Sequence, residues 1–216
     1  VYAVIRGIGA SSDGKGKGIT APNPRGQEFA LRRAYAEAGI DPVEVDLYEC
    51  HGTSTVVGDK VEVESLTKVM GEGRRGDRGP IRIGSVKSNI GHLKSAAGAA
   101  SCIKAALSLH NQLFPPSINF QNARSDVPFD KVPLQVQTTA EPWPDGPVRR
   151  VGVSAFGFGG TNFHMVIEED RPDAPTFQAP AQAPPAPALA DQPLPPAVWG
   201  LSAMNREGLV SALERN

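Results

Sequence analysis

The sequence predicts a layered α/β fold, and three observations support this prediction. Short apolar runs alternate with helical patterns over residues 1–170, an order that is typical of a sheet covered by helices. Glycines and prolines fall between these runs, where turns are needed. Hydrophobic residues make up 40% of the 216 residues and charged residues 21%, which is the composition of a chain that forms a core.

The first three elements are expected in the order strand, helix, strand. The first strand should span 1–9 and the second 43–50, because both segments are rich in apolar residues. The helix between them should begin at Pro24, since Asn23 is a good N-cap and proline fits the first helical position. Alanines then recur on one face of this helix until Gly39, which is a typical C-cap.

A second helix should begin at Asp59 as its cap, with Glu62 three residues later in the spacing of a capping box. Gly71 should end this helix. The third strand is expected at 81–86. Residues 92–110 have the pattern of a long helix rich in Ala, Gly and Ser. Because small side chains let a helix approach its neighbours closely, we expect this helix to be buried.

The composition changes after residue 170. Residues 171–197 are dominated by Pro and Ala and favour an extended polyproline conformation, which predicts a linker. An apolar pattern resumes at 198–216 and is typical of the start of another domain. Since the chain opens within a strand pattern and closes within a helical one, we expect it to belong to a longer protein.

Charge and composition argue against several classes of function. The 22 Lys and Arg residues nearly balance the 23 Asp and Glu residues, so we expect binding neither to nucleic acid nor to a membrane surface. No apolar run reaches the 18 residues of a membrane span. The two cysteines, Cys50 and Cys102, exclude a disulfide framework and favour a cytoplasmic location. Without paired cysteine spacing, no metal site is expected.

Two further features have a structural explanation. Residues 9–15 match the spacing of a phosphate-binding loop, but Gly16 stands where the metal-binding Ser or Thr is required, so a surface turn is favoured over a nucleotide site. His164 alternates with apolar residues in a strand pattern, and we expect it to be a buried structural histidine.

Three glycine-containing loops carry the candidate chemistry. His51 and His92 each follow a predicted strand, and the loop at 156–162 follows a strand expected at 148–154. The carboxyl ends of strands are where α/β sheets place their ligands. The residues alone therefore predict one pocket with two imidazoles, a lysine and threonine hydroxyls, suited to acyl or phosphoryl transfer.

Taken together, these loops resemble the β-ketoacyl synthases, the condensing enzymes of fatty-acid and polyketide synthesis. The matching segments are HGTST at 51–55, GSVKSNIGH at 84–92 and GFGGTNFH at 157–164. The resemblance covers residues 1–170 and implies the C-terminal half only of a thiolase-like, layered α-β-α-β-α fold. Residues 171–197 would then lead from a polyketide synthase ketosynthase domain toward an acyltransferase, with its linker region beginning within 198–216.

The resemblance also implies a reaction. Members of the family decarboxylate a malonyl thioester held on acyl carrier protein, and the resulting enolate attacks an acyl group on a cysteine. His51 and His92 match the two catalytic histidines, each of which would donate an N–H to the thioester oxygen. Lys87 and Glu62 match a lysine and an acidic residue, for which we expect a partly buried ion pair that fixes the loop geometry.

The remaining implied residues bind substrate. Thr53 and Thr55 would hydrogen-bond the phosphopantetheine arm, which acyl carrier protein delivers and which is not attached to this chain. Phe158 would gate the acyl pocket and contribute its backbone N–H to an oxyanion hole. Phe156 and Gly159 flank it in the same loop.

The family's nucleophilic cysteine is expected in the N-terminal half of the domain, outside this sequence. Cys50 should face away from His51 and Cys102 should be buried in a helix, and a reactive thiolate needs an exposed, electropositive position. The expected partners are that N-terminal half, acyl carrier protein, a second copy in a homodimer and an adjacent acyltransferase domain. The alternative is a non-catalytic homologue of the chain-length-factor type, but His92 and Lys87, retained together with His51, favour the enzyme.

Overall fold

The structure is a computed structural model. It describes residues 1–15, 18, 21–70, 79–127, 129 and 132–171. The predicted helix end at Gly71, the segment at 198–216 and all but the first residue of the predicted linker lie outside the described residues.

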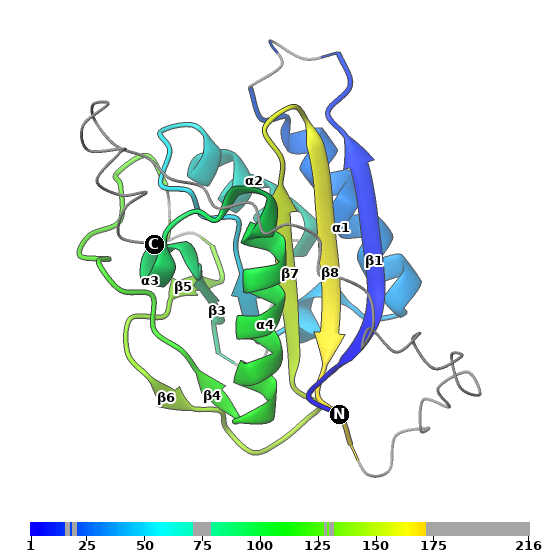
Figure 1. The fold of residues 1–216 in the computed structure, drawn as a ribbon, viewed down its shortest axis with the longest axis vertical. Coiled ribbons are helices and arrows are strands. Elements are labelled where there is room, and N and C mark those ends of the chain that lie inside the picture. The colour runs from blue at the N-terminus through cyan, green and yellow to red at the C-terminus, as the bar shows by residue number, and fades with distance from the viewer. Residues whose placement is uncertain (16–17, 19–20, 71–78, 128, 130–131, 172–216) are drawn as a thin grey trace, which may run out of the picture. The chain divides into compact units, whose positions relative to one another are not determined.

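Six strands form a mixed sheet in the order β1-β8-β7-β2-β3-β5 (Figure 1). They are β1 (Val4–Ser12), β2 (Leu47–Glu49), β3 (Ile81–Gly84), β5 (Leu134–Val136), β7 (Arg150–Phe156) and β8 (Thr161–Glu168). The four strands from β7 to β5 are mutually parallel, whereas β8 runs antiparallel to both β1 and β7. Two short strands, β4 (Leu113–Phe114) and β6 (Glu141–Pro142), pair separately. The carboxyl ends of β7, β2 and β3 therefore lie side by side at one edge.

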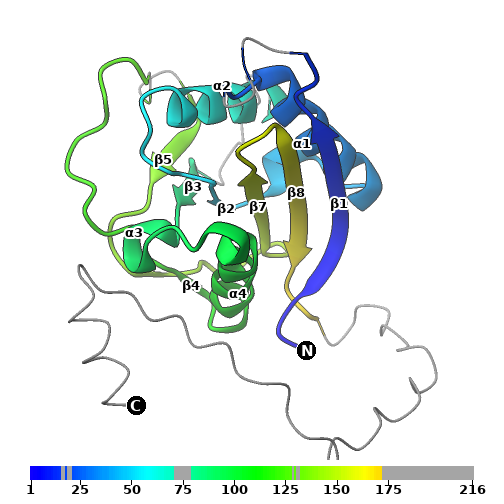
Figure 2. The same ribbon diagram turned by 45° about the horizontal axis from the view of Figure 1, so that its top comes forward.

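Helices cover both faces of this sheet (Figure 2). The long helices are α1 (Pro24–Ala38), α2 (Gly58–Met70) and α4 (Ala97–His110), and the short ones are η1 (Pro42–Glu44), α3 (Lys87–Ile90) and η3 (Lys94–Ala96). Apolar side chains of α1 and α2 form one core with β2 and β3, and those of α4 form a second core with β7. The predicted α/β layering is confirmed.

The first helix has the predicted ends. The Asn23 side chain accepts the backbone N–H of Arg25 at 3.1 Å, and Gly39 closes the helix with a left-handed φ of 64°. This helix lies unusually close to β1, because a β-carbon on Gly9 would sit only 1.9 Å from the carbonyl oxygen of Ala30. Glycine in β1 therefore sets the distance between the strand and α1.

Four strands differ from their predicted bounds. β3 ends at Gly84 instead of 86, and β7 spans Arg150–Phe156 instead of 148–154. β1 is displaced toward the C-terminus of the predicted 1–9. The predicted strand at 43–50 is divided into η1 and a three-residue β2. The cause is local, since Pro42 fixes the backbone and the Asp41 side chain accepts the N–H of Val43 at 3.0 Å, which closes a turn.

The predicted helix at 92–110 begins later, at Ala97. Lys94, the first residue of η3, has a left-handed conformation with φ of 55°, which interrupts the helix. Its burial is also one-sided: Ile103 is 61% exposed and Leu107 45% exposed, whereas Ser101 and other small residues are buried against the sheet. The prediction of a buried helix therefore holds for one face only.

His164 is the buried structural histidine that the strand pattern predicts. Its Nδ1 is 3.0 Å from the Ser154 hydroxyl and its Nε2 is 3.3 Å from the Tyr35 hydroxyl. Burial lowers the pKa of His164 to about 3, so the ring is neutral within the core.

Candidate active site

Three loops meet at the edge where β7, β2 and β3 end. His51 lies two residues after β2, Lys87 begins α3 after β3, and Phe156 is the last residue of β7. The rings of His51 and His92 contact edge to face, with centroids 5.7 Å apart, and the His51 and Phe156 centroids are 5.9 Å apart. The parallel register of these strands brings the three loops together.

The tautomer of each imidazole is fixed by a backbone hydrogen bond. The N–H of Phe156 donates to Nδ1 of His51 at 3.4 Å, and the N–H of Lys94 donates to Nδ1 of His92 at 3.0 Å. A nitrogen that accepts carries no proton, so each neutral ring holds its proton on Nε2. Both rings therefore offer one N–H donor of fixed position.

Charge and burial keep the two rings neutral. Burial, then the positive charge of Lys87 and then His92, lower the pKa of His51 to about 4. Partial desolvation, followed by Lys87 and Lys94, lowers the pKa of His92. At neutral pH the site thus holds two uncharged imidazoles beside an ammonium group.

Glu62 fixes the loop that carries the first histidine. Its buried carboxylate accepts the backbone N–H of His51 at 2.7 Å and that of Gly52 at 2.9 Å. Burial raises the pKa of Glu62 to about 7, although both hydrogen bonds favour the charged form. The carboxylate is therefore a backbone acceptor for the loop.

The predicted ion pair between Lys87 and Glu62 is wrong. Among the described residues, no ion pair within 4.0 Å joins them. Each Glu62 oxygen instead accepts a backbone N–H of the 51–52 segment. Burial lowers the pKa of the half-buried Lys87 ammonium, although Glu62 and Glu49 act in the opposite direction.

The predicted cap of α2 is also wrong. The helix begins at Gly58, whose N–H donates to the Thr55 hydroxyl at 3.1 Å. Asp59 lies within the first turn, and its carboxylate accepts the N–H of Ser54 at 3.0 Å instead. Both contacts hold the HGTST segment against the start of α2, with the hydroxyl oxygens of Thr53 and Thr55 3.5 Å apart.

Sequence reasoning missed a buried ion pair at the base of the site. The Lys104 ammonium lies 2.8 Å from Oε2 of Glu49, and the Glu49 side chain is only 1% exposed. The other carboxylate oxygen accepts the N–H of Val86 at 2.5 Å. The sequence did contain a hint of this pair. Glu49 ends an apolar strand, and Lys104 lies three and four residues from Ser101 and Ser108, on the face of α4 that is buried.

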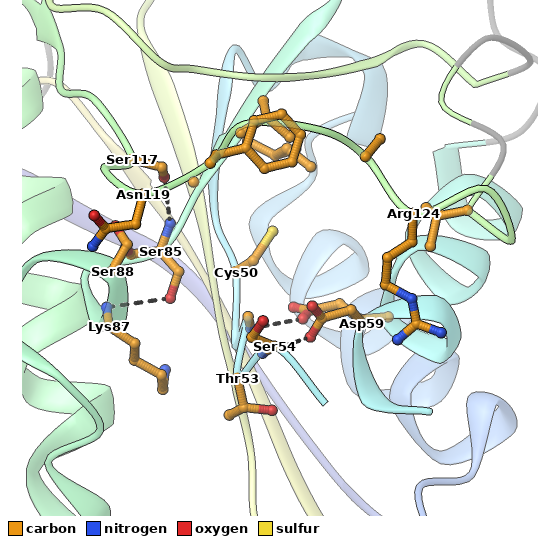
Figure 3. A pocket seen from close by; sticks show the side chains of 18 of the residues that line it. Cys50, Thr53, Ser54, Asp59, Ser85, Lys87, Ser88, Ser117, Asn119 and Arg124 are labelled. Atoms are coloured by element: carbon orange, nitrogen blue, oxygen red, sulfur yellow. Dashed lines mark hydrogen bonds between the residues drawn. The ribbon is translucent and has the colours of Figure 1, made fainter. Parts of the chain in front are cut away.

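A cavity of about 490 Å³, drawn in Figure 3, has His92 among its lining residues. Four of the predicted site residues line it: Thr53, Glu62, Lys87 and His92. The other five, which are His51, Thr55, Phe156, Phe158 and Gly159, are not among its lining residues. The rest of the wall includes Cys50, the hydroxyls of Ser85, Ser88 and Ser117, the side chains of Asn119 and Arg124, and apolar residues such as Val63, Ile83 and Val136.

The two cysteines are not activated. Burial raises the pKa of the Cys50 thiol well above its usual value, and the carboxylates of Glu62, Glu49 and Asp59 add to the effect. Burial, followed by Glu49, also raises the pKa of Cys102. Both groups are thiols at neutral pH. Cys50 is buried, but Cys102 is only partly buried on α4, so the expectation that Cys102 is buried is wrong.

The β7–β8 turn presents the third loop. Gly159 and Gly160 have φ values of 123° and 83°, which favour glycine, and a β-carbon on Gly160 would lie 3.0 Å from that of Asp13. The Phe158 side chain is 90% exposed at this turn. Phe156, at the start of the turn, is buried against His51.

Two features are absent from the described part of the chain. No three His, Cys, Asp or Glu side chains are grouped there in a way that could hold a metal ion. None of the described helices combines the length and apolar character that crossing a membrane demands.

Solved structures similar to this chain include ketosynthase domains. The ketosynthase from module 6 of the bacillaene synthase of Bacillus subtilis 168 matches with a TM-score of 0.74 and 42% identity, over 80% of this chain and 32% of that one. The Streptomyces albus oxazolomycin ketosynthase domain matches with a TM-score of 0.75 and 36% identity, over 86% and 32%. The chain therefore has the predicted thiolase-like α/β fold.

Sequence comparison then identifies the family. A family model described as the C-terminal domain of β-ketoacyl synthase matches residues 2–121, and one described as a ketoacyl-synthetase C-terminal extension matches 124–215. The chain belongs to the β-ketoacyl synthase family, as the three sequence segments predict.

Curated proteins similar to this chain include polyketide synthases. A phenolphthiocerol/phthiocerol polyketide synthase of Mycobacterium tuberculosis is 47% identical over 170 residues, which are 78% of this chain and 9% of that protein. Polyketide synthase GfsA of Streptomyces halstedii is 42% identical over 187 residues, or 86% and 2%. The chain thus spans less than a tenth of these relatives and about a third of the solved ketosynthases.

Proposed function

We propose that this chain supplies the two histidines with which a polyketide synthase ketosynthase performs decarboxylative condensation. The domain would join an acyl thioester to a malonyl-type thioester on acyl carrier protein. The observation that carries this proposal is that Nδ1 of His51 and Nδ1 of His92 each accept a backbone N–H, which leaves the proton of each neutral ring on Nε2. Two fixed N–H donors suit a thioester oxygen on which negative charge develops.

The reaction balances with these donors. The bond between the malonyl carboxylate and the α-carbon breaks, carbon dioxide leaves, and the electron pair passes to the thioester oxygen as an enolate. His51 and His92 donate hydrogen bonds to that oxygen. The α-carbon then attacks the acyl thioester carbon, and the cysteine thiolate leaves. Because neutral donors suffice, the imidazoles need not transfer a proton.

Lys87 and Glu62 would support the histidines in different ways. The Lys87 ammonium lowers the pKa of both rings and favours a nearby malonyl carboxylate or enolate. Glu62 holds the backbone at His51 and Gly52. In this proposal the lysine acts through its charge and the glutamate through geometry.

The phosphopantetheine arm would arrive with the carrier protein as part of the substrate. Thr53 lines the cavity, which fits a contact between its hydroxyl and the amides of the arm. Thr55 lies next to it but also caps α2. Phe158, exposed at its turn between Phe156 and Gly159, would gate the acyl pocket and offer its backbone N–H to an oxyanion.

The nucleophilic cysteine would come from the N-terminal half of the domain. Apolar side chains exposed on α4, such as Ile103 and Leu107, and on β1 and β8, such as Ile8 and Phe163, support a covering partner there. A second copy in a homodimer and an acyltransferase beyond the linker at 171–197 complete the proposed cytoplasmic assembly.

The test is decarboxylation by the full ketosynthase domain. His51→Ala and His92→Ala should each lower carbon dioxide release from malonyl–carrier protein by about 10²- to 10³-fold, while self-acylation of the cysteine survives. His110→Ala, at the exposed end of α4, is the matched control. A His51→Ala variant that decarboxylates at the parent rate would refute the proposal. A parent that only associates with an active synthase would instead indicate a non-catalytic homologue.

A further inference from the structure

One buried carboxylate joins three elements beneath the proposed site. Glu49 ends β2, and its Oε2 lies 2.8 Å from the ammonium of Lys104 on α4. Its Oε1 accepts the N–H of Val86 at 2.5 Å, just before α3, and lies 3.4 Å from the Ser101 hydroxyl on α4. The side chain is 1% exposed, so these contacts replace its hydration.

Stability alone does not account for a pair in this place. Removing two charges from water costs free energy that their attraction often fails to recover, and apolar replacements of a buried pair are often as stable or more so. Burial accordingly raises the pKa of Glu49, against the opposing effect of Lys104. The position of the carboxylate is therefore the better guide to its role.

The position couples the two histidine loops. Glu49 is two residues before His51, and Val86 is the residue before Lys87, in the segment that leads to His92. A hydrogen bond from Val86 to Glu49 thus ties the end of β2 to the start of α3. This hydrogen bond therefore connects the segment before His51 to the segment that leads to His92.

The α3 loop has a second anchor, on its other side. The Ser117 hydroxyl accepts the N–H of Ser85 at 3.1 Å, and the Ser85 hydroxyl accepts the N–H of Lys87 at 3.4 Å (Figure 3). These bonds hold α3 to the loop at 117, but they make no link to β2. The N–H of Cys50 donates to the carbonyl of Gly84 at 2.7 Å and joins the ends of β2 and β3. The hydrogen bond from Val86 to Glu49 extends this connection past β3, to the residue before α3.

We propose that Glu49, held in place by Lys104, is a positioning residue for decarboxylation. Its carboxylate sets the separation of His51 and His92, so that both Nε2–H groups reach one thioester oxygen. This role rests on the function proposed above. It assigns to Lys104 the task of fixing the carboxylate rather than of contacting substrate.

Two double variants of the full domain isolate the Val86 hydrogen bond. Glu49→Gln with Lys104→Met and Glu49→Met with Lys104→Met both remove the charged pair without leaving a lone buried charge. Only the glutamine can still accept the N–H of Val86. We expect the methionine double variant to release carbon dioxide from malonyl–carrier protein about 10- to 100-fold more slowly than the glutamine one, in kcat rather than KM, because small misplacements of reacting groups have effects of this size.

A structural control separates this effect from lost stability. Arg149 and Glu169 form another ion pair, at 2.8 Å and partly buried, beside the opposite end of β7. The double variant Arg149→Met, Glu169→Met should lower the melting temperature but leave the ratio of decarboxylation to self-acylation unchanged. Hydrogen exchange at the Val86 amide gives a readout independent of activity, and exchange should be faster in the methionine variant than in the glutamine variant.

The outcomes are distinguishable. Equal decarboxylation rates in the two Glu49 double variants, with an active parent, would overturn the positioning role alone. Equal exchange of the Val86 amide in both would overturn it as well. A parent domain that acylates its cysteine but releases no carbon dioxide would overturn the proposed function itself.

Discussion

The rings of His51 and His92 meet edge to face, at an interplanar angle of 86° and a centroid separation of 5.7 Å. Each ring accepts a backbone N–H on Nδ1, from Phe156 and Lys94 respectively. The backbone, and not a second side chain, therefore leaves Nε2 as the donor of each ring. This arrangement leads to the first prediction.

Both imidazoles should be neutral and protonated on Nε2 at pH 7. The pKa of His51 is lowered to about 4, so its ring should take up a second proton only near that pH. Nitrogen-15 NMR of the histidine rings in the full domain distinguishes the tautomers and follows the titration. A proton on Nδ1 of His51 at pH 7 would contradict the assignment.

Lys87 should depress the pKa of both histidines. Because its charge disfavours the imidazolium at each ring, Lys87→Met should raise both pKa values toward the usual 6.5. Lys94→Met is the matched control, since Lys94 contributes to the lowered pKa of His92 but not to that of His51. The same NMR titration measures both. Equal shifts of His51 in the two variants would show that the effect is not local.

Glu62 should make stability fall as the pH rises. Its pKa is about 7 in the folded chain against 4.5 for an unperturbed glutamate, so between these values the folded state holds a proton that the unfolded state has lost. The free energy of unfolding therefore decreases with pH over this range. The unfolding free energy of the parent minus that of Glu62→Gln, from denaturant titrations, should decrease from pH 4.5 to 7. A difference that grows would mean that the hydrogen bonds from His51 and Gly52 outweigh burial.

The contact between β1 and α1 should tolerate no side chain at Gly9. A β-carbon there would lie 1.9 Å from a carbonyl oxygen of the helix, and overpacking of this kind costs about 1–3 kcal/mol. Gly9→Ala should therefore lower the melting temperature of the full domain. Gly98→Ala is the control, because its β-carbon would make an ordinary contact of 3.6 Å and alanine favours a helix. Equal melting temperatures for the two variants would refute the close packing.

The features that sequence predicted best depend on neighbours along the chain. Asn23 and Gly39 cap α1 through bonds within a few residues, and these need no knowledge of the fold. The placement of His51 and His92 past strand ends also follows from local patterns, and the parallel sheet then brings them together. Local sequence patterns were therefore enough to predict the helix ends and the positions of the two histidines.

What sequence missed depends on contacts between distant segments. The family resemblance suggested that Lys87 and Glu62 pair, but it cannot show that both Glu62 oxygens face the backbone. Glu49 and Lys104 pair only because α4 packs on the face of the sheet toward which the Glu49 side chain points. The cap at Asp59 failed for a different, local reason, since the Thr55 hydroxyl accepts the N–H of Gly58, the first residue of α2.

The 216-residue chain alone should not catalyse condensation. Burial raises the pKa of Cys50 and of Cys102, so neither supplies a thiolate to hold an acyl group. The face of α4 that carries Ile103 and Leu107 is exposed, and an uncovered apolar surface of this kind promotes aggregation. Light scattering should detect aggregation of the chain expressed alone, and mass spectrometry should detect no stable acyl group on it.

The full domain should behave differently in both assays. There the same face should be covered, the protein should stay in solution, and acyl loading should appear on a cysteine outside this sequence. Ile103→Lys sharpens the comparison, because it should improve the solubility of the isolated chain and prevent folding of the full domain, where the side chain would be buried. Stable acylation of the isolated chain at Cys50 or Cys102, followed by chain extension, would show that the nucleophile lies within these residues after all.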